Sequence, residues 1–215
     1  ENIPDLIISD VMMPQKNGFE VCDFLKNDER TSHIPIILLT AKADSDSKIV
    51  GLKRGADAYL SKPFDKEELL VRLEKLVERQ KKMVTYFSKK NFITENPIEE
   101  ITLEEAIQIE DVFIQKVKKI IEENYSDENF ALPQLCQKIR MSRSQLFRKM
   151  KALVDTSPSN FIRTYRLEKA KHFLETTEMN VSEVSWEVGF KDVSHFSKAF
   201  QNVFGYLPSD VKDNQ

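Results

Sequence analysis

The segment "LIISDVMMPQKNG", residues 6–18, decides the fold of the first part of the chain. Leu6 to Ser9 form a short, mostly apolar run that is typical of a buried strand, and the carboxylate of Asp10 follows it directly. A charge at the end of a buried strand is costly unless other groups bind it or it has a chemical role. The segment therefore predicts a polar site at the end of this strand.

Strand and helix patterns alternate through the residues that follow. Apolar runs typical of strands occur in "IPIILLT" and "DAYLSKP", and helices are predicted at 18–28, 44–55 and 65–82. Strands that alternate with helices indicate βαβ units and a parallel sheet. We therefore predict an α/β fold for this part of the chain.

The ends of the three predicted strands carry polar side chains. Because ligands of an open parallel sheet bind at the carboxyl ends of its strands, Asp10, Thr40 and Lys62 are expected to meet at one edge. This set suits phosphoryl transfer: Asp10 is the nucleophile, Lys62 pairs with a phosphoryl oxygen and Thr40 donates a hydrogen bond to another. The spacing alone leaves a second interpretation open, in which Asp10 caps the next turn and Lys62 forms an incidental salt bridge.

Four segments of this region resemble the receiver domain of two-component response regulators. They are "PDLIISDVMMP", "NGFEVC", "IPIILLTAK" and "GADAYLSKPF", and the resemblance covers about residues 3–80. It implies a phosphoacceptor at Asp10, a switch hydroxyl at Thr40, a switch aromatic at Tyr59 and a phosphoryl-contacting lysine at Lys62.

The same resemblance shows where the chain departs from the family. The receiver fold has five strands, and this chain begins with the third, so the expected fold is a partial flavodoxin-like receiver made of the last three βα units. The acidic pair that binds Mg²⁺ belongs to the absent first strand, so Asp10 and the backbone carbonyl of Met12 form an incomplete metal site. We expect Mg²⁺ in the intact receiver and no bound cofactor in this fragment. The family also has a cis peptide bond before the proline at position 63.

Phosphatases of the haloacid-dehalogenase type are a rival class that also uses an Asp nucleophile. They require a second Asp two positions after the nucleophile as the general acid. Position 12 is Met, which argues against this class.

The composition of the 215 residues is that of a globular protein with no membrane span, since 31% are charged and no long apolar run occurs. The net charge of −3 is unevenly distributed: residues 138–171 hold ten Lys and Arg against two Asp and Glu. A locally basic second half suggests nucleic acid as its partner. Two cysteines that lie far apart in sequence favour a reduced, intracellular protein.

The pattern changes after the first domain, which we place at 1–82. Residues 83–110 are acidic, include a proline and lack a clear period, so they are interpreted as a linker with little fixed structure. The rest of the chain, 111–215, is predicted to be an all-α domain. Its helices are placed near 111–124, 131–139, 143–154, 158–174, 181–188 and 192–203.

Two segments of the all-α domain have the form of a helix, a tight turn and a second helix. In "LPQLCQKIRMSRSQLFRKMKAL", Ser142 can cap the second helix, and in "VSEVSWEVGFKDVSHFSKAFQNVFG", Gly189 permits the turn. A plain helical hairpin is an alternative for each segment. Two such units joined by the basic helix "SPSNFIRTYRLEKAKHFL" favour DNA binding, because this helix could hold two reading helices about one DNA turn apart.

Residues 126–212 resemble the AraC/XylS-type DNA-binding domain from end to end. Asp155 stands where this family usually has Gly after the first reading helix, and Asp tolerates the left-handed conformation better than most residues. By position, the resemblance implies that the DNA-binding residues are Arg143, Ser144, Phe147, Arg148, Ser194, His195 and Lys198.

A receiver followed by an AraC-type domain resembles the C-terminal end of hybrid two-component proteins. The expected function is that of a phosphorylation-controlled, sequence-specific transcription regulator that is not itself an enzyme. Its expected partners are double-stranded DNA, a phosphodonor histidine kinase within the same parent chain and a second copy of the protein. The expected location is the cytoplasm, with a parent protein anchored in the inner membrane. The alternative is a phosphorylation-independent DNA-binding protein whose receiver remnant serves only association.

Overall fold

The computed structural model describes residues 3–41, 55–91 and 101–211, which fall into two compact units. The first unit takes in residues up to 110 together with 148–155, and the second takes in 111–147 and the residues from 156 onward. Among the helices within the described ranges, none combines the length and the apolar character that a membrane span requires.

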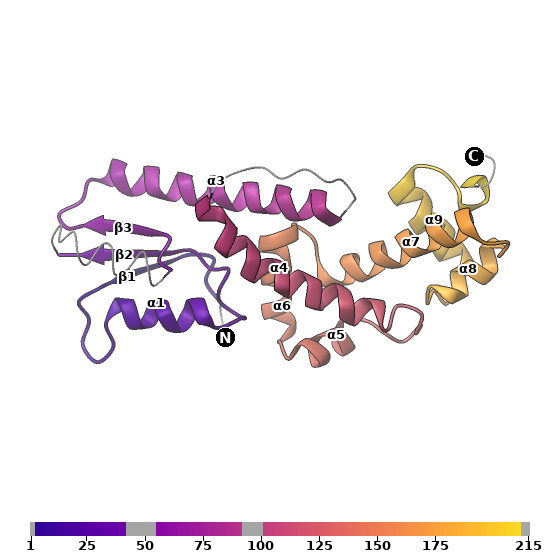
Figure 1. The fold of residues 1–215 in the computed structure, drawn as a ribbon, viewed down its shortest axis with the longest axis horizontal. Helices are drawn as coiled ribbons and strands as arrows, with labels where there is room; N and C mark the ends of the chain where they lie inside the picture. The colour runs from indigo at the N-terminus through magenta and orange to yellow at the C-terminus, as the bar shows by residue number, and fades with distance from the viewer. Residues whose placement is uncertain (1–2, 42–54, 92–100, 212–215) are drawn as a thin grey trace. The chain divides into compact units, whose positions relative to one another are not determined.

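The first unit contains a three-stranded parallel sheet (Figure 1). The strands are β1 (Ile7–Asp10), β2 (Ile36–Thr40) and β3 (Ala58–Ser61), in this order across the sheet. The register pairs Asp10 with Leu39 and Thr40 with Ser61, so the three strands end at one edge. The prediction of an α/β fold with parallel strands is confirmed.

Helices cover both faces of this sheet. Helix α1 (Gly18–Asn27) packs against one face through Cys22, with Ile36 and Leu38 buried beneath it. Helix α3 (Lys66–Asn91) packs against the other face through Leu76, which meets side chains such as Ile37. Alternate residues of β2 thus point to opposite helices, as expected for a strand that is buried on both faces.

Regular structure extends into the segment that was expected to be a linker with little fixed structure. Helix α3 continues to Asn91 and α4 (Ile101–Glu122) begins at Ile101, so that expectation is wrong for 83–91 and 101–110. Neither stretch contains a Gly or a Pro that would stop a helix. The role of 83–110 as the segment between two domains stays a prediction. The helix predicted at 44–55 lies, except for Gly55, outside the described residues.

The all-α part follows the predicted helices closely. After α4 the elements are α5 (Leu132–Ile139), α6 (Arg143–Val154), α7 (Pro158–Thr176), α8 (Val181–Glu187), α9 (Val193–Phe204) and the short 3₁₀ helix η1 (Pro208–Val211).

The first helix-turn-helix unit consists of α5, a tight turn and α6. Arg140 caps the C-terminus of α5 and, with a φ of 59°, adopts the left-handed conformation. Ser142 caps α6: its Oγ accepts from the backbone N–H of Gln145 at 3.2 Å, and Oε1 of Gln145 accepts from the N–H of Ser142 at 2.8 Å. The apolar faces of both helices are buried, through Leu135, Ile139, Leu146, Met150 and Leu153.

The second helix-turn-helix unit consists of α8, its turn and α9. Gly189 occupies the turn with a φ of 78°, and Asp192 caps α9 by accepting from the N–H of His195 at 2.6 Å. Three phenylalanines form an aromatic stripe along α9: the ring centroids of Phe196 and Phe200 lie 5.8 Å apart, and those of Phe200 and Phe204 lie 4.5 Å apart. This cluster packs against α7 through Leu167, Ala170 and Leu174.

Candidate functional site

The carboxyl edge of the sheet brings the predicted charged pair together. Asp10, at the end of β1, forms an ion pair through Oδ2 with Nζ of Lys62, which follows β3 directly. The backbone N–H of Met12 donates to Oδ1 of Asp10 at 3.1 Å. Thr40 ends β2 at the same edge, and its carbonyl accepts from the N–H of Lys62 at 2.6 Å. The peptide bond between Lys62 and Pro63 is cis.

The electrostatics of this edge keep Asp10 ionised. The hydrogen bond from Lys62, followed by that from the N–H of Met12, holds the pKa of the Asp10 carboxyl below its ordinary value. The Asp10 side chain remains 32% exposed and that of Lys62 remains 42% exposed. A carboxylate that is charged at neutral pH and open to solvent is available to an incoming phosphoryl group.

Gly18 fixes the backbone beneath this carboxylate. A Cβ at position 18 would lie 2.4 Å from the carbonyl oxygen of Asp10, which is closer than atoms can approach without displacement. Asn17 starts α1 at this point, since its side chain accepts from the N–H of Glu20 at 2.9 Å. The sequence pattern marked Asn17-Gly18 as a helix start, and the contact with Asp10 gives this glycine a second role.

Tyr59 lies inside β3 and is 6% exposed. Its ring is tilted against that of Phe19, with 6.3 Å between the centroids, in the core between the sheet and α1. The structure therefore places Tyr59 in the core on β3, which β2 separates from the strand of Asp10, and its role as a switch stays a prediction.

The described residues do not form a Mg²⁺ site on their own. They include no cluster of three or more His, Cys, Asp or Glu side chains that could hold a metal ion. At the carboxyl edge, both oxygens of Asp10 already accept hydrogen bonds from Lys62 and Met12. Mg²⁺ requires near-octahedral oxygen coordination, which one such carboxylate and the carbonyl of Met12 cannot supply.

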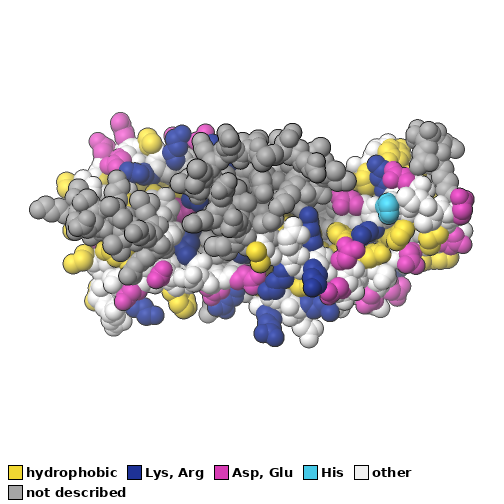
Figure 2. Space-filling view, viewed as in Figure 1, with side chains coloured by type: hydrophobic (Ala, Val, Ile, Leu, Met, Phe, Trp, Pro, Cys, Tyr) yellow, Lys and Arg dark blue, Asp and Glu magenta, His cyan; other side chains and the backbone are white. Residues whose placement is uncertain are grey.

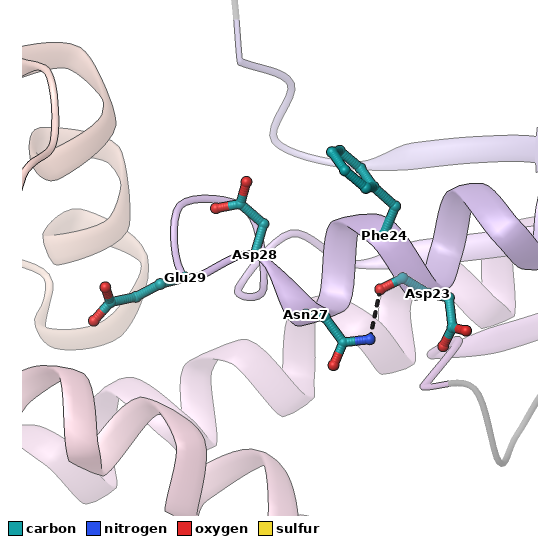
Figure 3. A pocket seen from close by; sticks show the side chains of 5 residues that line it. All are labelled: Asp23, Phe24, Asn27, Asp28 and Glu29. Atoms are coloured by element: carbon teal, nitrogen blue, oxygen red, sulfur yellow. Dashed lines mark hydrogen bonds between the residues drawn. The ribbon is translucent and has the colours of Figure 1, made fainter.

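A hollow of about 590 Å³ lies at the end of α1 (Figure 3). It is lined by Asp23, Phe24, Asn27, Asp28 and Glu29. Two of its polar groups bond to neighbours: Nδ2 of Asn27 donates to the carbonyl of Asp23 at 2.8 Å, and Asp28 pairs with Arg30. The hollow lies at the end of α1 that is far from Gly18 and Asp10, so it is not part of the phosphoryl site.

The predicted DNA-binding residues lie on the outer faces of α6 and α9. Arg143, Ser144 and Phe147 are exposed on α6, where Phe147 keeps 47% of its surface open, and Arg148 is half-buried. Ser194, His195 and Lys198 are exposed on α9. Figure 2 shows several Lys and Arg side chains, interspersed with Asp and Glu, in the region of the view where α4, α5 and α6 overlap in Figure 1. The second helix of each helix-turn-helix unit thus presents polar, partly basic side chains to solvent.

Family models and relatives agree with this arrangement. A model described as the response regulator receiver domain matches residues 1–74, and one described as a helix-turn-helix domain matches residues 135–214. The protein named histidine kinase P4 from Formosa agariphila is 39% identical over 213 residues, which are 99% of this chain and 15% of that protein. The phosphate regulon regulatory protein PhoB from Pseudomonas aeruginosa is 51% identical over 76 residues, 35% of this chain and 33% of that protein.

This chain thus spans no more than a third of either relative. Among solved structures, the C-terminal domain of the two-component response regulator yesN from Fusobacterium nucleatum is 31% identical to this chain, with a TM-score of 0.45. The match covers 47% of this chain and 98% of the yesN chain. The sequence motifs that resemble the AraC type lie largely within the matched helix-turn-helix region. Residues 1–74 therefore match the response regulator receiver domain and residues 135–214 match a helix-turn-helix domain, in which the motifs of this chain resemble the AraC type.

Proposed function

We propose that this chain is the output end of a phosphorylation-controlled, sequence-specific transcription regulator and that it binds double-stranded DNA through α6 and α9. The observation that carries the proposal is the pair of helix-turn-helix units, each with its own buried apolar face and an outward polar face on its second helix. Helix α7, which joins the units, has 19 residues and is therefore roughly 28 Å long. This length suits two contacts about one DNA turn, roughly 34 Å, apart.

The side chains on the reading helices suit both modes of DNA contact. Arg148 can donate two hydrogen bonds to a guanine edge, and the exposed ring of Phe147 can meet a thymine methyl group. Arg143, Lys198 and the hydroxyl groups of Ser144 and Ser194 can bind phosphate oxygens. Phosphate contacts give affinity and salt dependence, whereas contacts with base edges give specificity.

Phosphorylation would act at Asp10 once Mg²⁺ is bound, which requires more carboxylate ligands than the described residues bring together. In the proposed step an Asp10 oxygen attacks the phosphorus of a phosphohistidine, the P–N bond breaks, and the histidine ring leaves and takes up a proton. Lys62, which now pairs with Asp10, would move its ammonium to a phosphoryl oxygen. The donor would be a histidine kinase in the same parent chain. A receiver followed by a helix-turn-helix domain is typical of regulators that are not enzymes, and the same is proposed for this chain.

The remaining expectations form part of the proposal. The protein would act in the cytoplasm as a homodimer, as the output end of a parent protein anchored in the inner membrane. A second candidate function is DNA binding that does not depend on phosphate, with residues 1–82 serving only association. It is favoured by the lack of a metal cluster among the described residues, because receivers need Mg²⁺ for phosphorylation. Sedimentation at several protein concentrations would test the dimer.

The proposed DNA binding is tested by selecting duplexes from a random pool and measuring affinity for the selected sequence. Arg148→Ala should weaken binding by about 1–3 kcal/mol and relax the preference at one base position. The matched control is Lys151→Ala, which removes a cation of the same helix that pairs with Asp155 and should leave the base preferences unchanged. Affinity should fall steeply with salt. An Arg148→Ala protein with wild-type base preferences would refute its role as a base reader.

A further inference from the structure

Arg166, in the middle of α7, makes long-range contacts that the DNA-binding model does not use. Its Nε donates to the carbonyl of Tyr125 at 2.8 Å. Its Nη2 donates to the carbonyls of Asp127 and Phe130 at 2.7 and 3.1 Å. All three acceptors lie in the segment 125–130, which connects α4 to α5. A half-buried guanidinium is therefore held by three backbone carbonyls rather than by a carboxylate.

The turn of the second helix-turn-helix unit packs on the same spot. A Cβ at Gly189 would lie 2.4 Å from the carbonyl oxygen of Tyr125 and 3.0 Å from a guanidinium nitrogen of Arg166. Two positions later, Nζ of Lys191 donates to Oδ1 of Asn129 at 2.9 Å. The turn between α8 and α9 thus touches both the segment 125–130 and Arg166.

These contacts join three parts of the second unit. The segment 125–130 leads within two residues into α5 of the first helix-turn-helix unit, and Gly189 lies three residues before Asp192, the cap of α9. Arg166 belongs to the helix that connects the two units. A hollow of about 360 Å³ beside the junction is lined by Arg166 and Gly189 together with His195, a proposed DNA-binding residue.

We infer that Arg166 is a positioning residue that fixes the separation of the two reading helices on DNA. Helix α7 by itself does not fix this separation, because the short connections 155–157 and 177–180, which join it to α6 and α8, can each act as a hinge. The Arg166 contacts restrict movement at these hinges, because they connect the segment 125–130, which precedes α5, with the turn between α8 and α9. The planar guanidinium can serve several carbonyls in fixed directions, which an ammonium group cannot do. The inference rests on the proposed DNA binding.

The test uses the duplex selected by the wild-type chain and a series of duplexes with one or two base pairs inserted between the two contacted grooves. Each inserted pair moves the second site by about 3.4 Å along the axis. A protein with two linked binding units loses affinity sharply when the spacing prevents both units from binding at once. The affinity of the wild-type chain for a duplex with an insertion should therefore be about tenfold or more below that for the original duplex. Arg166→Ala should bind the original duplex about tenfold less tightly and lose less than about threefold on insertion, because its units can adjust. Fluorescence anisotropy measures both quantities.

Three further variants separate positioning from other effects. Arg163→Ala removes an exposed arginine of the same helix that bonds only to Asn160 in the described contacts, and should keep the wild-type spacing profile. Gly189→Ala disturbs the junction from the other side and should flatten the profile. Arg166→Lys keeps the positive charge and should give an intermediate profile, which also provides the readout if Arg166→Ala does not fold.

Each outcome decides a different point. If the wild-type chain binds no duplex, the proposed function itself fails. If the affinity of the wild-type chain does not depend on the inserted base pairs, the positioning role of Arg166 is overturned while DNA binding stands. The same conclusion follows if folded Arg166 variants lose as much affinity on insertion as the wild-type chain does.

Discussion

Two aspartates at opposite ends of the same sheet have different surroundings. Asp57, just before β3, pairs with Lys26 at 2.7 Å and with Arg79 at 2.9 Å, and accepts from the N–H of Ile36. Its side chain is 11% exposed. Asp10, at the carboxyl end of β1, has one cation, Lys62, and is 32% exposed.

The difference separates an aspartate that holds the fold from one that is open to chemistry. Asp57 links α1, β2 and α3, because its partners come from each of these elements. Asp10 bonds to its own turn and to a single lysine, so its loss would leave few groups unsatisfied. Sequence position at a strand end is therefore not sufficient to identify a site, since both residues carry a carboxylate next to a buried strand.

The largest expected effect comes from Asp57→Ala. It leaves two cations and one backbone N–H without their acceptor, so the free energy of unfolding should fall by about 3 kcal/mol. Asp10→Ala is the matched control and should have a much smaller effect. Urea denaturation of both proteins measures the difference, and equal losses in the two variants would remove the distinction between the aspartates.

A smaller effect is expected from pH, through His33 in the turn before β2. Burial, together with two nearby ammonium groups, lowers the pKa of His33 to about 3. The unfolded chain binds a proton at this residue below about pH 6.5, whereas the folded chain does not, so stability falls as the pH falls. The loss should reach about 2 kcal/mol at pH 5. The free energy of unfolding, measured between pH 7 and pH 5, should show this loss in the wild type but not in His33→Gln. An identical pH dependence in the two proteins would contradict the role of His33.

The smallest effect concerns the carboxyl edge. Gly18→Ala places a methyl group against the carbonyl of Asp10 and should lower stability by about 1 kcal/mol, because the backbone of Asp10 must shift. Amide resonances of Asp10 and Val11 should move in NMR spectra, while that of Asp57 should stay in place. Asp23→Ala, an exposed change on the same helix, is the control. Unshifted Asp10 resonances would show that Gly18 does not support the site.

The sequence predicted those features that local chemistry determines. Ser142 caps α6, Gly189 takes the left-handed conformation in its turn, and Asp155 adopts a φ of 49°, as its position in place of a glycine predicted. The pairing of Asp10 with Lys62 followed from the rule that parallel strands end at one edge.

Other features depend on contacts that leave no pattern in the sequence. Arg166 bonds to backbone carbonyls about forty residues away, and carbonyls belong to every residue type. The same holds for Asp57, whose cations lie in two different helices. The sequence does not indicate the helices at 83–91 and 101–110, because their hydrophobic period is weak and Pro97 lies between them, although neither stretch contains a Gly or a Pro.

The most direct test of the account measures the intact mass of this chain after incubation with acetyl phosphate and Mg²⁺, together with its affinity for the selected duplex. Because the described residues offer Asp10 without a metal cluster, the chain should gain no phosphate at a useful rate. It should still bind DNA, because the apolar faces of both helix-turn-helix units are buried and the second unit has a core cluster of its own. A response regulator whose receiver domain carries an acidic pair that binds Mg²⁺ serves as the positive control. Rapid gain of one phosphate by this chain, abolished by Asp10→Asn, would contradict the account.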